Sequence, residues 1–171
     1  MEKEDLHEPN IIATQLLREL ESEAAASRKC LERITPANYE WKPHEKSMKM
    51  GYLSLLVAEV PLWIATTLET GNIDFATFKH ADMATVDLAV HLDENMARAK
   101  AALFKATDAD LAGSFHLKSG GQVLMTDTKL NTISSSINHW VHHRGQLTVY
   151  MRLNDIPVPS IYGPSADDKT F

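Results

Sequence analysis

The chain has 171 residues, of which 44% are hydrophobic and 23% are charged, and its formal net charge is -6. These values are typical of one ordinary soluble domain with a sizeable core, so we expect a single domain over residues 1–171. The acidic balance argues against a nucleic-acid binder, which usually carries a basic face. The one cysteine, Cys30, excludes an intrachain disulfide and a Cys-rich metal site.

The start of the chain and its apolar segments indicate where the protein works. Residues 2–5 are all charged, and the start of the chain lacks the apolar core of a signal peptide. No apolar run approaches the ~20 residues that a membrane-spanning helix needs. We therefore expect a cytoplasmic protein that does not enter a membrane.

Long periodic segments, separated by few glycines and prolines, predict helices. The predicted helices run from about Pro9 to Ile34, from a cap at Ser47 to a stop at Gly71, from about Ala81 to Thr107, and from a cap at Asp127 to about Leu153. Residues 111–126 surround a Ser-Gly-Gly turn and predict a small hairpin or ordered loop before the last helix. The proline-rich tail, residues 156–164, cannot be helical. The fold class is therefore all-α, a four-helix bundle with one insertion.

Two histidines in the last predicted helix are the most informative feature of the chain. His139 and His143 are one helical turn apart, so their rings project from the same face. Neutral imidazoles at this spacing can bind one divalent transition metal, although paired histidines also occur as surface or capping residues. Gln146 and Tyr150 continue the same row beside the apolar stripe, where they could orient a substrate or a metal-bound water.

Arg144 falls in the middle of that apolar stripe, where an unpaired guanidinium would be costly. We expect it to pair with Asp93 or Glu59, which the helical pattern places on inward-facing or flanking positions. The alternative is that Arg144 extends to the surface along its aliphatic stem. The neighbouring Gly145 costs about 1 kcal/mol relative to alanine in a helix, which suggests that another backbone or a second subunit packs closely there.

Several segments resemble the DinB-like superfamily. The segments are His139–Leu147 with the tail Pro157–Ser165, the loop Trp41–Ser47, and the helix segments Met50–Leu53 and Ala58–Trp63. The resemblance implies an up-down-down-up four-helix bundle, often a homodimer. It also implies a divalent metal, zinc or nickel, held by three histidines. Characterised relatives include thiol-dependent transferases and isomerases, although many members have no assigned reaction, so the resemblance suggests a metal-dependent thiol transferase or hydrolase.

The resemblance fails at one ligand. His139 and His143 match the two metal ligands of the last helix, but the position of the ligand on the second helix is occupied by Leu56, which cannot bind a metal. Glu59 lies one turn further along the helix face that would meet the histidines. The other pocket candidates on that face are Tyr52 and Trp63.

Three interpretations stay open. Glu59 replaces the missing imidazole, or two histidines and solvent bind the metal weakly, or the metal site is vestigial and the pocket is an apolar cavity. The corresponding functions are a metal-dependent enzyme and a metal-free bundle that binds a small apolar ligand or acts as a dimeric interaction module. Both hypotheses expect a small-molecule ligand, a homodimer and no nucleic acid.

Overall fold

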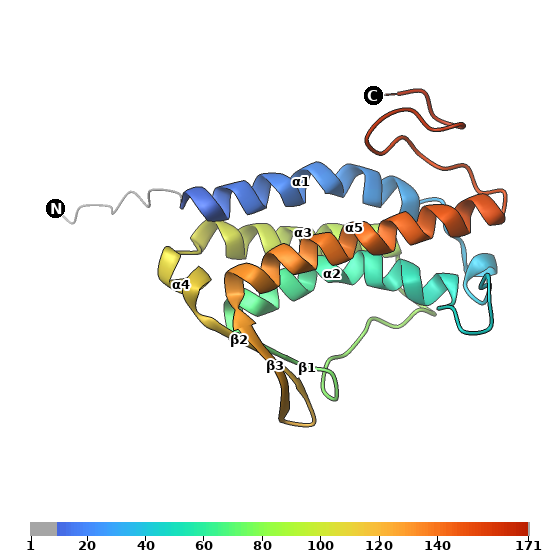
Figure 1. The fold of residues 1–171 in the computed structure, drawn as a ribbon. Coiled ribbons are helices and arrows are strands. Elements are labelled where there is room, and N and C mark those ends of the chain that lie inside the picture. The colour runs from blue at the N-terminus through green and yellow to red at the C-terminus, as the bar shows by residue number, and fades with distance from the viewer. Residues whose placement is uncertain (1–9, 171) are drawn as a thin grey trace.

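The computed structural model describes residues 10–170. Figure 1 shows the long helices α1 (Ile11–Leu31), α2 (Met50–Thr70), α3 (Leu88–Lys105) and α5 (Lys129–Leu153) packed side by side. Helices α1 and α5 run in one direction, and α2 and α3 run in the other, which is the expected up-down-down-up order. The predicted start near Pro9 lies outside the described residues. Helix α1 begins at Ile11, where the Asn10 side chain accepts a hydrogen bond from the amide of Ala13.

A small sheet at one end of the bundle corrects the all-α prediction. The predicted hairpin is present as β2 (Ser114–Ser119) and β3 (Gln122–Thr128), which pair antiparallel. Strand β1 (Asn72–Asp74) adds to β2 in parallel, so the sheet order is β1-β2-β3. Gly71 ends α2 in the left-handed conformation, and the chain enters β1 at the next residue. Two short elements, η1 (Pro36–Asn38) and α4 (Asp108–Ala112), complete the fold.

Several helices are shorter than predicted, and at the start of α3 the reason is that local side chains capture backbone amides. Helix α3 begins at Leu88 rather than Ala81, since Asp87 caps it by accepting from two amides and Asp82 holds a turn through the amide of Ala84. Helix α1 ends at Leu31 rather than Ile34. The N-cap of α2 is Lys49 rather than Ser47, and that of α5 is Thr128 rather than Asp127.

Helix α2 is the central helix, and it packs against both α3 and α5. It is long and apolar enough to cross a membrane by composition, but most of that surface is buried inside the bundle. Opposite it on α5, the buried Trp140 donates an indole hydrogen bond of 2.7 Å to the carbonyl oxygen of Val57. This bond fixes how α5 lies along α2, because a buried indole N–H requires a partner.

A buried ion pair joins α5 to α1 and corrects the predicted partner of Arg144. The guanidinium, in a residue only 1% exposed, lies 2.5 Å from the Glu23 carboxylate. The hydroxyl of Tyr162, from the C-terminal tail, accepts from Arg144 and donates to Glu23. Arg144 therefore has the buried carboxylate that its position demanded, but the partner is neither Asp93 nor Glu59. Arg144 faces α1 rather than α3, and Asp93 of α3 pairs with Arg28 at the surface instead.

Removing the buried carboxylate should cost far more stability than removing an exposed one. We expect Glu23→Gln to lower the free energy of unfolding by about 3–5 kcal/mol, because the Arg144 charge would stay buried without compensation. The matched control is Asp93→Asn, which breaks the exposed pair with Arg28 and should cost less than about 1 kcal/mol. Urea denaturation measures both values, and similar losses for the two variants would contradict this account.

Candidate functional site: a histidine pair beside an apolar cavity

The histidine pair on α5 forms a hydrogen-bonded chain with Gln146. The Nδ1 atom of His143 lies 2.9 Å from Oε1 of Gln146, and its Nε2 atom lies 2.5 Å from Nε2 of His139. Because an amide oxygen only accepts, Nδ1 of His143 carries the hydrogen, and Nε2 of His143 is left to accept from the Nε2–H of His139. The predicted row of polar side chains along this helix therefore exists as a connected set.

Both imidazoles are held in the neutral form. Burial lowers the pKa of His139 below its usual 6.5, and the neighbouring His143 and His142 rings lower it further. Burial likewise lowers the pKa of His143, and this effect outweighs the hydrogen bond to Gln146, which acts in the opposite direction. Near pH 7 the pair thus offers ring nitrogens and a shared proton rather than a positive charge.

The helix facing this pair supplies an aromatic ring but no third metal ligand. Trp63 on α2 packs edge-on against His139, with ring centroids 5.4 Å apart. Leu56 lies two turns earlier on the same helix face and is buried. At the position where the resemblance implies a metal ligand on the second helix, this chain therefore has a hydrocarbon side chain.

The Glu59 carboxylate is engaged by groups other than the histidine pair. Its carboxylate, only 1% exposed, accepts from the backbone amide of Ala81 at 2.8 Å and lies 2.5 Å from Nδ1 of His80. Nε2 of His91, from α3, lies 3.4 Å from Oε1, the oxygen that accepts from Ala81. Both oxygens are therefore engaged by α3 and by the connection that leads to it. Within residues 10–170, no group of three or more His, Cys, Asp or Glu side chains is arranged to hold a metal ion. The residues present do not fit a three-ligand metal site.

A cavity of about 290 Å³ lies next to His139, between the sheet and helices α2 and α5. The strand register builds its outer wall, because Phe115 lies opposite Asp127 and Leu117 lies opposite Met125, so that alternate residues face inward. Most of the lining is apolar or aromatic. The lining residues are Trp63, Ile73, Phe75, Phe115, Leu117, Met125, Asp127, Thr132, Ser135, Ser136 and His139.

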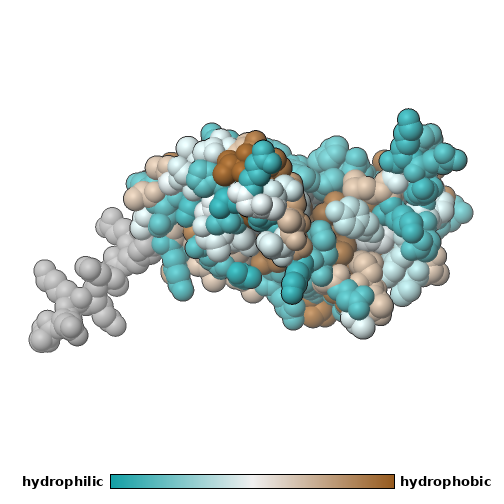
Figure 2. Space-filling model, turned by 90° about the horizontal axis from the view of Figure 1, so that it is seen from below, coloured by the Kyte–Doolittle hydropathy of each residue, from teal (hydrophilic) through white to brown (hydrophobic). Residues whose placement is uncertain are grey.

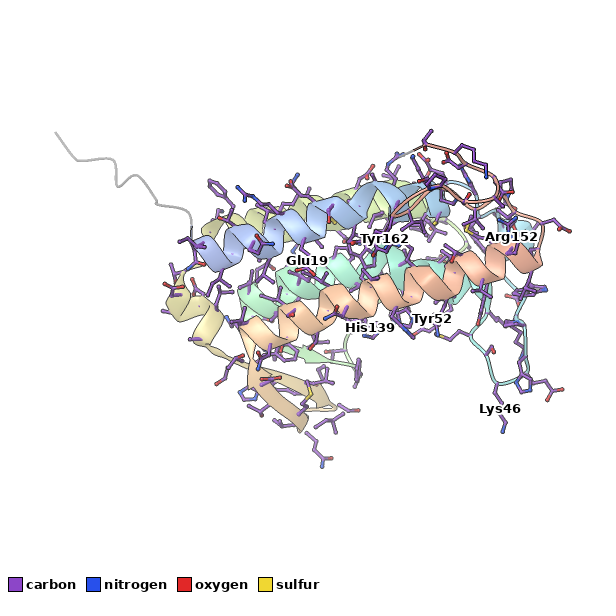
Figure 3. The ribbon with its side chains drawn as sticks, turned by 45° about the horizontal axis from the view of Figure 1, so that its top comes forward. Glu19, Lys46, Tyr52, His139, Arg152 and Tyr162 are labelled. Atoms are coloured by element: carbon purple, nitrogen blue, oxygen red, sulfur yellow. The ribbon has the colours of Figure 1, made fainter. Side chains whose placement is uncertain are left out.

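Part of the surface near the sheet is also apolar. Val123, Leu124 and Met125 of the hairpin are each about half exposed. Figure 2 shows a patch of apolar surface among hydrophilic surface on the lobe nearest the viewer. Figure 3 places His139 and Tyr52 along one side of α5, whereas Tyr162 lies on the side of α1. The cavity and the buried ion pair thus belong to different sides of the last helix.

The predicted pocket residues divide into two groups. Trp63 lines the cavity. Gln146 is connected to the cavity-lining His139 through His143. Tyr150 is buried against Trp41, and Tyr52 contacts the ring of His80; neither lines the cavity. Sequence reasoning missed the sheet residues that form the outer wall. Their alternation was visible in the sequence, but which side of the hairpin would face the bundle was not.

Comparison with known proteins identifies the family. The sequence matches the DinB family model over residues 3–170, so the chain belongs to the DinB family. No curated protein matches it.

Solved structures confirm the fold. A DinB-like protein from Bacillus subtilis is similar with a TM-score of 0.68 and 21% identity, covering 91% of this chain and 99% of its own. A candidate family member from Exiguobacterium sibiricum has a TM-score of 0.62 and 16% identity, covering 86% and 95%. A DinB-like protein from Bacillus cereus has a TM-score of 0.59 and 20% identity, covering 87% and 97%. At these identities the likeness establishes the fold alone.

Introducing a histidine on α2 should create a metal site, because the natural chain lacks a third ligand there. We expect Leu56→His to take up about one equivalent of Zn²⁺ or Ni²⁺, because three imidazoles and solvent form a stable ligand set. The unaltered protein should bind substoichiometrically under the same conditions. Metal analysis of untagged protein after dialysis measures both, and the double variant Leu56→His with His143→Ala is the control that should lose the metal. A full equivalent on the unaltered protein would contradict this assignment.

Proposed function

We propose that this DinB-family chain binds a small, mainly apolar molecule in the cavity between the sheet and helices α2 and α5. The observation that carries the proposal is the cavity itself. Its volume and its largely apolar and aromatic lining, with a few polar groups at defined positions, are those of a small-molecule site. The sheet, which the all-α prediction did not include, forms the outer wall of this cavity.

The histidine pair would orient such a ligand. His139 lines the cavity, and its ring is fixed by Trp63 on one side and by the hydrogen bond to His143 on the other. A rigidly held, neutral imidazole can exchange a hydrogen bond with a hydroxyl or amine of the ligand without a large desolvation cost. The exposed Ser135, one turn before His139, adds a hydroxyl to the same wall.

Binding is favoured over a metal-dependent thiol transferase or hydrolase by the donor set. Leu56 supplies no ligand, and the Glu59 carboxylate is engaged by His80 and Ala81. Two imidazoles alone would hold a divalent ion weakly. We propose that the protein acts in the cytoplasm, as expected from the sequence.

Filling the cavity should abolish binding of a neutral probe. We expect 2-phenylethanol to bind the protein weakly but saturably and to shift the NMR signals of the lining residues Ile73 and Met125. Ser135→Trp should weaken this binding at least about tenfold, or 1.4 kcal/mol, because the indole occupies the cavity. Ser134→Trp is the matched control, since Ser134 is exposed on the same helix and does not line the cavity. Binding that is unaffected by Ser135→Trp, or no saturable binding, would overturn the proposal.

We further propose a homodimer through the outer face of α5. Gly145 is exposed, and a Cβ atom added there would meet nothing within 4 Å in the described part of the chain. The described part of the chain therefore does not supply the close neighbour expected at this glycine. Val149 and Leu153, one and two turns along, are 57% and 58% exposed and extend the same face.

Light scattering tests the dimer. We expect twice the chain mass at high micromolar concentration and a single chain mass for Val149→Glu, because a charge would be buried in the interface. Val90→Glu, which places the same charge at a half-exposed valine of α3, is the control. The mass of one chain for the unaltered protein would refute the dimer.

A further inference from the structure

We infer that the cavity selects a ligand that carries a protonated amine on its apolar body. The inference rests on the proposed function and names the class of molecule that the cavity would take. It depends on one residue of the wall, Asp127, and on the fact that no described lysine or arginine lines the cavity or pairs with it.

Asp127 is the only carboxylate that lines the cavity among the described residues. It lies on the inward side of β3, directly opposite Phe115, and is partly buried. Its Oδ1 atom accepts from the backbone amide of Thr128 at 2.7 Å and from the Asn131 side chain at 2.9 Å. No described residue bonds its Oδ2 atom. A negative charge in the wall thus keeps one oxygen available to a bound molecule.

No described lysine or arginine side chain pairs with this charge. Among residues 10–170, no lysine or arginine lines the cavity or forms an ion pair with Asp127. His139 is held neutral, because burial lowers its pKa. The cavity therefore offers hydrogen-bond acceptors and one formal negative charge. An ammonium group entering it would be attracted, whereas a carboxylate or phosphate would meet repulsion without compensation.

The rest of the lining suits the same ligand. Trp63, Phe75 and Phe115 present aromatic rings around an apolar space. Aromatic faces attract ammonium groups, and aromatic or aliphatic bodies gain from leaving water at the same surface. A charge-assisted hydrogen bond from the ammonium to Oδ2 would fix the orientation of the molecule.

A purely structural role for Asp127 does not account for this arrangement. As the residue before the N-cap of α5, a carboxylate there favours the helix terminus and holds Asn131. That role uses Oδ1. It gives no reason for an inward-facing carboxylate on a wall whose other strand residues, Phe115, Leu117 and Met125, are apolar. Asp127→Asn separates the two roles, because it keeps an oxygen acceptor and removes the charge.

Three probes of the same shape test the selectivity by calorimetry at pH 7: 2-phenylethylamine, 2-phenylethanol and phenylacetate. We expect the amine to bind at least about tenfold more tightly than the alcohol, and the acid to bind more weakly than either. Asp127→Asn should abolish the difference between amine and alcohol. Asp108→Asn, an exposed carboxylate outside the cavity, should keep the preference.

A second measurement needs no variant. Raising NaCl from 50 to 500 mM should weaken binding of the amine and leave that of the alcohol unchanged, because salt screens the attraction between charges. Equal affinities for amine and alcohol, or a preference for the amine that survives Asp127→Asn, would overturn the amine assignment while the cavity stands as an apolar site. No binding of any probe would overturn the proposed function as well.

Discussion

The packing of α5 against α2 is the constraint on which the site depends. Trp140 is fully buried, and its indole donates to the Val57 carbonyl oxygen, so the two helices cannot slide past each other without leaving a buried donor unpaired. With that alignment fixed, His139 meets Trp63. The ion pair between Arg144 and Glu23 on the other side of α5 holds the same helix against α1. The orientation of α5 is therefore determined from both sides.

A buried carboxylate and a small sheet then decide what this bundle can do. In one interpretation of the sequence, Glu59 on α2 supplies a ligand to the histidine pair. Its oxygens instead contact the backbone amide of Ala81 and the ring of His80. The connection from β1 to α3 is thereby fastened to the bundle. The sheet, in turn, closes one side of a cavity that the helices alone would leave open, and it brings Asp127 to face Trp63 and His139 across an apolar space.

Much of the scaffold could be predicted from the sequence, but the site could be predicted only in part. The long helices, the stop at Gly71, the hairpin around Gly120 and Gly121, and the row from His139 to Gln146 are consequences of local pattern and spacing. The parallel pairing of β1 with β2 was missed because a strand of three residues has no periodicity to detect. The early start assigned to α3 failed because Asp82 and Asp87 compete for the amides that a longer helix would need.

The sequence by itself determined that two imidazoles share one helix face, that Leu56, at a position where the family resemblance implies a metal ligand, has no group to bind a metal, and that Arg144 requires a buried carboxylate. These are properties of spacing and chemical type, which local geometry carries unchanged into the fold. Only the tertiary structure decided that Glu23 rather than Asp93 meets Arg144, that Glu59 serves α3 and its connection, and that Asp127 faces a cavity. Each of these depends on which surfaces face each other across the bundle, and that choice is made by the packing of segments far apart in the chain.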